Sequence, residues 1–312
     1  METFRRLALA STLATLALVT LGGLVRATKS GLGCGTDWPR CSGELLPAME
    51  SRAVLIEFSH RAAASLVVVL LGALALVAWR HLRATPLMWG AFAAFGLVLF
   101  QAVLGAVVVK LELAAVSVVL HLVTAMALLA VLVYVTAAAS AGAGVSSFVP
   151  DGAAARGAAR AAGAVLVLLA VGSYVSGTPG AGLAFGDWPL MGGRLIPPLE
   201  VEAAALHFTH RALAAVAGIA VAAVCLGVIR RRGELALQAR AALVALGAFA
   251  LEVVVGAANV WTELNAAVVT VHLFLGALIW TALVTLAVVS RPLPAAVPER
   301  VSRTSPAFDS AR

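Results

Sequence analysis

Four histidines stand at repeated positions inside strongly apolar parts of this sequence. The stretch Glu57-Phe58-Ser59-His60-Arg61 returns as His207-Phe208-Thr209-His210-Arg211, with an offset of 150 residues between His60 and His210. About sixty residues after each copy, a further histidine opens another apolar stretch; these are His121 and His272, with an offset of 151. An ionisable side chain within an apolar segment of membrane-spanning length is costly, and it therefore indicates function.

A pair of histidines on separate helices is suited to hold a flat haem between them. Neutral imidazoles bind metals. Zinc would need three or four converging ligands, whereas axial ligation of a haem in a helix bundle needs only two. We therefore predict two haem sites, one at His60 and His121 and one at His210 and His272. A buried histidine can also hydrogen-bond to a neighbouring helix, but that explanation is weak for four histidines at one depth.

The two repeats differ at one chemically important position. Glu57 lies three residues before His60, on the same helix face, whereas His207 takes its place before His210. A carboxyl beside a haem can exchange protons or stabilise a cation. This asymmetry predicts a reaction in the first half and electron transfer in the second. The alternative is an interfacial glutamate in contact with water.

Four other polar residues near the histidines each have two explanations. Arg61 and Arg211 could bind haem propionates, or they could extend to the membrane interface. Gln101 and Glu252 are related by the repeat. They could line the haem cavities or make hydrogen bonds between helices.

The composition requires elements that cross a membrane. The 312 residues are 62% hydrophobic and 12% charged, whereas soluble domains have about 25% charged residues. The mean hydropathy is +1.02. We therefore predict a polytopic membrane protein. The net charge of +7 is explained by basic cytoplasmic loops, and no nucleic-acid partner is expected.

Eight apolar runs are long enough to span a bilayer, which takes about 20 residues. The first run could be a signal peptide, but its internal counterpart at 160–176 favours a retained helix. The fold class is therefore all-α, with eight transmembrane helices. The runs lie near residues 7–25, 54–79, 87–109, 113–137, 160–176, 203–229, 238–258 and 266–289.

The repeat divides the chain into two four-helix halves. Asp37-Trp38-Pro39 matches Asp187-Trp188-Pro189, again 150 residues apart. Because each half has an even number of helices, both halves have the same orientation, which predicts two pseudo-symmetric parallel bundles. The predicted divisions are an N-terminal bundle over 1–140, a linker over 141–159, a C-terminal bundle over 160–290 and a disordered tail over 291–312.

The basic residues predict the orientation in the cell membrane. With the N-terminus inside, the inner segments hold fourteen Lys and Arg residues and the outer segments hold six. This distribution favours cytoplasmic N- and C-termini. The long loops near 26–53 and 177–202 would then face outward.

The first of these loops contains two of the three cysteines, Cys34 and Cys41. A disulfide between them is plausible on the oxidising side of the membrane. It could brace the loop, or it could exchange electrons. The second loop has Met191 in place of Cys41, so no bridge is expected there. Cys225 is expected to be a small core residue.

The sequence resembles the haem A synthase family. The resemblance begins with Gly22-Gly23-Leu24-Val25-Arg26-Ala27-Thr28 and Ser30-Gly31-Leu32, continues through Cys34, Asp37-Trp38-Pro39 and Cys41, and covers about residues 5–290. The glutamate and four histidines described above fall where that family has its own. Only the combination of these motifs is specific, since each one alone would be weak.

The resemblance implies a reaction and a division of roles. The family oxidises the C8 methyl of haem O to a formyl group, giving haem A for terminal oxidases. It implies that His210 and His272 hold haem b. It further implies that haem O, the substrate, binds near His60 and His121, with Glu57 as the catalytic carboxyl. The cysteine pair would help in electron or haem transfer, although this chain lacks the second pair that some members carry.

Two rival functions and several partners remain open at this point. A b-type cytochrome for quinone-linked electron transfer would hold two permanent haems b, and a haem carrier would leave the porphyrin unaltered. Glu57, with no counterpart at His207, favours the enzyme. The expected partners are membrane lipid, an electron donor of unknown kind and haem O synthase, the last inferred from the pathway alone. A homo-oligomer is compatible with the sequence.

Overall fold

The computed structural model describes residues 1–142, 149–231, 233 and 235–292, and its long elements are all helices. Within these residues, each of the eight long helices is long and apolar enough to cross a membrane. The predicted all-α, multi-pass membrane fold is therefore confirmed. The helices are α1 (Glu2–Ala27), α2 (Arg52–His81), α3 (Pro86–Lys110), α4 (Ala115–Gly142), α5 (Gly152–Gly177), α6 (Glu202–Arg230), α7 (Ala236–Trp261) and α8 (Ala266–Val289), with a short 3-10 turn, η1 (Ala181–Leu183), between α5 and α6.

Helix α5 begins earlier than its apolar run predicts, at Gly152 rather than near residue 160. Asp151 caps it, because its Oδ1 accepts hydrogen bonds from the backbone N–H groups of Ala153 (2.9 Å) and Ala154 (3.0 Å). Such a cap stabilises a helix by about 1 kcal/mol. The alanines that follow are strong helix formers, although nearby arginines lower the local hydropathy.

The segment 141–159, which we predicted to be a linker, is consequently helical at both of its ends. Residues 143–148 lie outside the described residues, as does the tail from residue 293 onward, where disorder was predicted. The start of α5 is held to the ends of two other helices. Asp151 pairs with Arg231 after α6 (2.7 Å), and its N–H donates to the carbonyl of Ser290 after α8 (2.9 Å).

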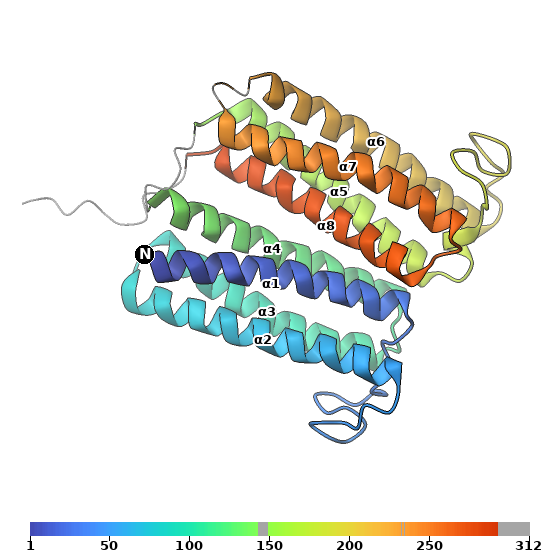
Figure 1. The fold of residues 1–312 in the computed structure, drawn as a ribbon, viewed down its shortest axis with the longest axis horizontal. Helices are drawn as coiled ribbons and strands as arrows, with labels where there is room; N and C mark the ends of the chain where they lie inside the picture. The colour runs from blue at the N-terminus through green and yellow to red at the C-terminus, as the bar shows by residue number, and fades with distance from the viewer. Residues whose placement is uncertain (143–148, 232, 234, 293–312) are drawn as a thin grey trace, which may run out of the picture.

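The helices form two groups of four that lie side by side (Figure 1). In the first group, α2 and α4 each pack against α1 and α3; in the second, α6 and α8 each pack against α5 and α7. The groups meet where α1 packs against α8 and where α4 packs against α5 and α8. Both long loops project from the same end of the molecule (Figure 1). The arrangement is compatible with the predicted pair of parallel bundles.

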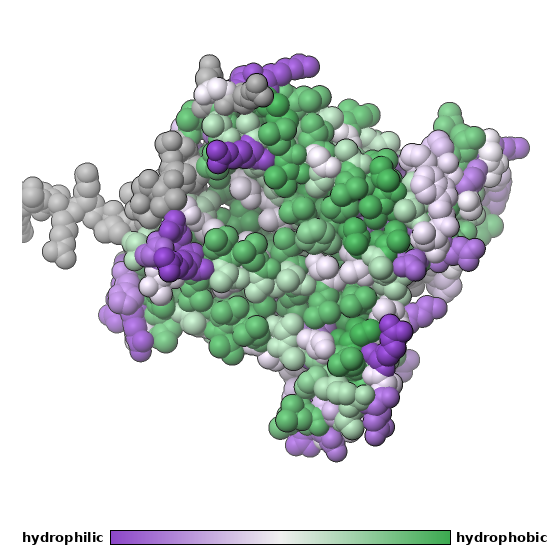
Figure 2. Space-filling model, viewed as in Figure 1, coloured by the Kyte–Doolittle hydropathy of each residue, from purple (hydrophilic) through white to green (hydrophobic). Residues whose placement is uncertain are grey.

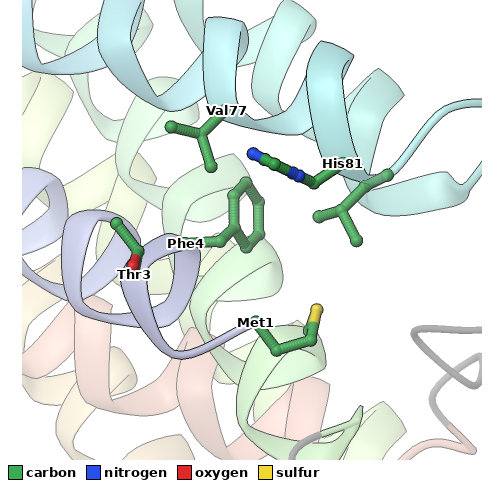
Figure 3. A pocket seen from close by; sticks show the side chains of 6 residues that line it. Met1, Thr3, Phe4, Val77 and His81 are labelled. Carbon is green, nitrogen blue, oxygen red and sulfur yellow. The ribbon is translucent and has the colours of Figure 1, made fainter.

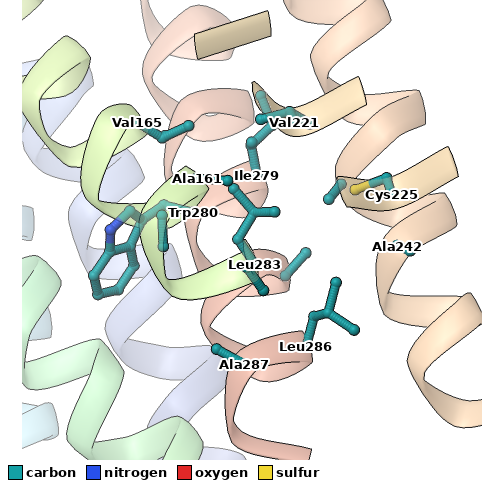
Figure 4. Packing of buried hydrophobic residues seen from close by; sticks show 14 of the residues in the cluster. Ala161, Val165, Val221, Cys225, Ala242, Ile279, Trp280, Leu283, Leu286 and Ala287 are labelled. Atoms are coloured by element: carbon teal, nitrogen blue, oxygen red, sulfur yellow. The ribbon is translucent and has the colours of Figure 1, made fainter. Parts of the chain in front are cut away.

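Apolar side chains fill the interior and also cover the outside of the helices. In the second bundle, Cys225 is fully buried among residues such as Val221 and Leu283 (Figure 4), which fits its predicted role as a small core residue. Large apolar residues such as Val69 and Ile219 are exposed on the flanks. Figure 2 shows apolar surface along the helices and hydrophilic surface gathered at their ends, as a membrane protein requires.

Candidate functional site

Each half places its two histidines on helices that face each other diagonally across the bundle. His60 lies on α2 and His121 on α4, and both helices pack against α1 and α3. His210 on α6 and His272 on α8 have the same relation to α5 and α7. All four histidines are half-buried. The paired histidines of each half therefore approach the bundle interior from opposite sides.

A glycine on the preceding helix supports each of these imidazoles. The glycine leaves room for the ring to lie close to the neighbouring backbone. A Cβ would crowd the ring at Gly22 and Gly172, whereas at Gly105 and Gly256 it would make an ordinary van der Waals contact. Sequence reasoning missed the role of these glycines, although their offsets of 150 and 151 residues repeat with the histidines. The distance between a Cβ placed on the glycine and Cε1 of the histidine would be 3.2 Å for Gly22 and His60, 3.4 Å for Gly105 and His121, 2.8 Å for Gly172 and His210, and 3.4 Å for Gly256 and His272.

The rings of His210 and His272 have the separation that a shared iron would need. Their centroids are 6.3 Å apart, with an angle of 77° between the ring planes. Two imidazoles on opposite sides of one metal ion, each bonded at about 2 Å, have centroids roughly 6 Å apart. The second pair of histidines therefore fits axial ligation of a haem.

The nitrogens of the four histidines agree with such a role. In each ring Nδ1 is buried without a hydrogen-bond partner, whereas no Nε2 of the four is buried in this way. Each imidazole therefore has a ring nitrogen that no protein group in the described residues satisfies. Among the described residues, no group of three or more His, Cys, Asp or Glu side chains converges as a metal cluster would. The zinc explanation consequently has no support in this part of the chain.

Glu57 is bound to the loop between α1 and α2. Its side chain is buried, and Oε2 accepts a hydrogen bond from the backbone N–H of Cys34 (2.8 Å). Oε1 pairs with the guanidinium of Arg61. Arg61 also donates to the loop carbonyls of Asp37 (2.8 Å) and Arg40 (2.9 Å). These contacts join the carboxyl group to the loop that carries the cysteines.

Cys34 and Cys41 form a disulfide, as predicted, and both are buried. The ring that the disulfide closes contains both loop carbonyls that Arg61 binds. The disulfide is therefore connected to Glu57, because the backbone N–H of Cys34 donates a hydrogen bond to the Glu57 carboxyl group. Sequence reasoning did not foresee this link, because the two residues are 23 positions apart.

The second half keeps the same support but exchanges the carboxylate for an imidazole. Arg211 donates to the carbonyls of Asp187 and Leu190, both at 3.0 Å, as Arg61 does in the first half. Its Nε donates to Nε2 of His207 at 3.0 Å. An imidazole that accepts this bond at Nε2 is neutral. The second site thus has no anionic group where the first has Glu57.

Both arginines therefore hold loop backbone, a role that we did not predict for them. The second loop is also fixed by Asp187, whose carboxylate accepts from the N–H groups of Gly192 (2.7 Å) and Gly193 (2.8 Å). These two hydrogen bonds lower the pKa of Asp187 below its usual value.

The polar pair on α3 and α7 contacts the histidine-bearing helices differently in the two halves. Gln101 on α3 donates from Nε2 to the backbone carbonyl of His121 (2.9 Å). Glu252 on α7 instead places Oε1 3.1 Å from Nδ1 of His272. The interhelical explanation is therefore the correct one for Gln101, whereas Glu252 contacts the imidazole itself.

A cavity of about 240 Å³ lies at the end of the first bundle opposite the long loops. Figure 3 shows His81 at its edge beside Phe4 and Val77. His81 is exposed there. The cavity is remote from the four histidines, and it takes no part in the candidate site.

Comparison with known proteins gives matches over most of the chain. The COX15-CtaA family model, described as cytochrome oxidase assembly protein, matches residues 5–284. A heme A synthase of Halalkalibacterium halodurans is 34% identical over 221 residues, which are 66% of this chain and 71% of that protein. A heme A synthase of Symbiobacterium thermophilum is 33% identical over 229 residues, 71% of this chain and 74% of its own.

Proposed function

This chain belongs to the COX15-CtaA family of cytochrome oxidase assembly proteins, and from this premise we propose how its two halves divide the work of a haem A synthase. As an oxidoreductase of this kind, it converts haem O to haem A for terminal oxidases. We assign the substrate, haem O, to His60 and His121 in the first half. We assign a resident haem b to His210 and His272 in the second.

The 6.3 Å separation of the His210 and His272 rings supports the second assignment. A haem b bound there would supply one-electron redox chemistry. The protein's own part is to present the two imidazoles from separate helices, with Gly172 and Gly256 packed against the rings. His207 takes the place of Glu57 beside this site, and its Nε2 accepts a hydrogen bond from Arg211.

The contrast between Glu57 and His207 carries the assignment of the reaction to the first half. Glu57 is a carboxyl group one helical turn from His60, held by Arg61 and by the N–H of Cys34. Such a group can accept a proton from the substrate as it is oxidised, or stabilise positive charge that develops on it. The loop contacts hold the carboxylate in one position, which is what efficient proton transfer requires.

The placement in the membrane is part of the same proposal. The excess of basic residues in alternate loops supports cytoplasmic N- and C-termini in the cell membrane. The disulfide loop and both histidine pairs would then lie toward the outer side. Haem O synthase is the partner expected to supply the substrate, because the product of that enzyme is the compound consumed here.

The proposal is tested by expressing the protein with a supply of haem O and analysing extracted haem by chromatography and mass spectrometry. Haem A should accumulate aerobically. A b-type cytochrome or a haem carrier would give only haems B and O, and that result would overturn the function.

The division of roles needs matched histidine variants. His210→Ala and His272→Ala should each remove the low-spin haem b spectrum, whereas His60→Ala and His121→Ala should keep that spectrum and lose haem A. If both second-half variants retained the spectrum, the assignment of the two halves would be wrong.

A further inference from the structure

Residues at the same place in the two repeats, Gln101 and Glu252, act on different atoms. Gln101 is neutral, and its amide donates a hydrogen bond to the backbone carbonyl of His121. Glu252 directs its carboxyl at the ring of His272, with 3.1 Å between Oε1 and Nδ1. The side chain of Glu252 is only 16% exposed. A carboxyl in contact with an imidazole is thus found in the second half at a position where the first half has an amide.

The contact is close but not aligned. The ring N–H of His272 does not point straight at the oxygen, and Oε2 of Glu252 is buried without a hydrogen-bond partner. Nδ1 of His272 and Oε2 of Glu252 therefore both have unused hydrogen-bonding capacity.

Resting on the proposed function, we propose that Glu252 is a positioning residue that orients His272 and sets the redox potential of the haem in the second half. A carboxylate that accepts the Nδ1–H of a metal-ligating histidine fixes the tautomer, so that Nε2 is the ligand nitrogen. It also makes the imidazole a stronger donor. A stronger donor and a nearby negative charge both favour ferric over ferrous iron, which lowers the midpoint potential.

The same residues explain why the effect is confined to one half. His121 has no carboxylate at the corresponding position, since Gln101 carries no charge and contacts only the main chain. Of Gln101 and Glu252, only Glu252 can therefore act on a ligand imidazole directly. Loss of a residue of this kind commonly costs 10–100-fold in metal binding or activity.

The test is a redox titration of the purified holoenzyme, followed through the absorbance of the low-spin haem. Glu252→Gln keeps the shape of the side chain and removes its charge. A tenfold loss of the preference for ferric iron would raise the midpoint potential by 59 mV. Glu252→Leu should raise the potential at least as much and should also lower the haem content. Glu263→Gln removes an exposed carboxylate in the loop after α7 and serves as the control, with no shift.

Two results would overturn the proposal: unchanged midpoint potentials in both Glu252 variants, or an equal shift in the Glu263 control. If Glu252→Leu fails to fold, Glu252→Gln still decides, because it is isosteric. Failure of the proposed function would look different. In that case the low-spin spectrum would be absent from the wild-type protein, or it would survive His272→Ala, whatever happened at Glu252.

Discussion

The contact between Gly172 on α5 and His210 on α6 leaves no room for a methyl group. In Gly172→Ala the new Cβ would lie 2.8 Å from Cε1 of His210, and close Cβ contacts in proteins rarely fall below 3.4 Å. The imidazole would have to withdraw by the difference, about 0.6 Å. Ligating groups need to be held within about 0.5 Å of their working position. The substitution should therefore displace this ligand from the haem.

The expected loss follows from the cost of overpacking, which is about 1–3 kcal/mol. If that cost falls on haem binding, affinity drops by about 5–150-fold. The fold itself should survive, because alanine favours a helix over glycine by about 1 kcal/mol. We expect Gly172→Ala to be purified as a folded, membrane-inserted protein with a reduced or shifted low-spin haem spectrum.

The assay compares haem content per protein and the low-spin absorbance of purified variants. Gly163→Ala is the matched control, because it lies on the same helix and a Cβ there meets nothing within 4 Å. Gly22→Ala should have a milder effect on the first site, since its Cβ would lie 3.2 Å from His60. A Gly172→Ala protein with the same haem content and spectrum as Gly163→Ala would refute the reasoning.

Three further predictions concern the loops and the carboxylate. Glu57→Gln should keep the haem spectrum of the second half and lose most haem A production, because it removes the carboxyl group one helical turn from His60; full production would reduce Glu57 to a structural residue. The double variant Cys34→Ser with Cys41→Ser should lower haem A production more than second-half haem content, since the N–H of Cys34 holds Glu57; equal losses would mean that the disulfide only stabilises the fold. The α5–α6 loop should be protected from proteolysis at neutral pH and should loosen as the pH falls through the lowered pKa of Asp187, because protonation weakens its bonds to Gly192 and Gly193. Its stabilisation is present above the ordinary pKa of 3.8 and is lost below the folded value; Asp187→Asn should abolish this pH dependence, and a loop equally protected in acid would contradict it.

Several features of the protein could be predicted from the sequence because they depend on local composition. A run of about 20 apolar residues must cross the bilayer as a helix, whatever its neighbours are. The disulfide was similarly local, since Cys34 and Cys41 share one short loop. The start of α5 was missed because the helices were predicted from runs of apolar residues. Such runs reveal neither a capping residue such as Asp151 nor a helical stretch that contains arginines.

What the sequence by itself determined is the set of repeated groups: the histidines, the cysteine pair, and the exchange of Glu57 for His207. The tertiary structure alone decided what each group contacts. Arg61 reaches loop carbonyls more than 20 positions away, and the partner of Gly172 lies on the next helix. Glu252 meets an imidazole where its counterpart meets a carbonyl. Such contacts depend on how helices rotate and pack against one another, and helix packing depends on many side chains at once.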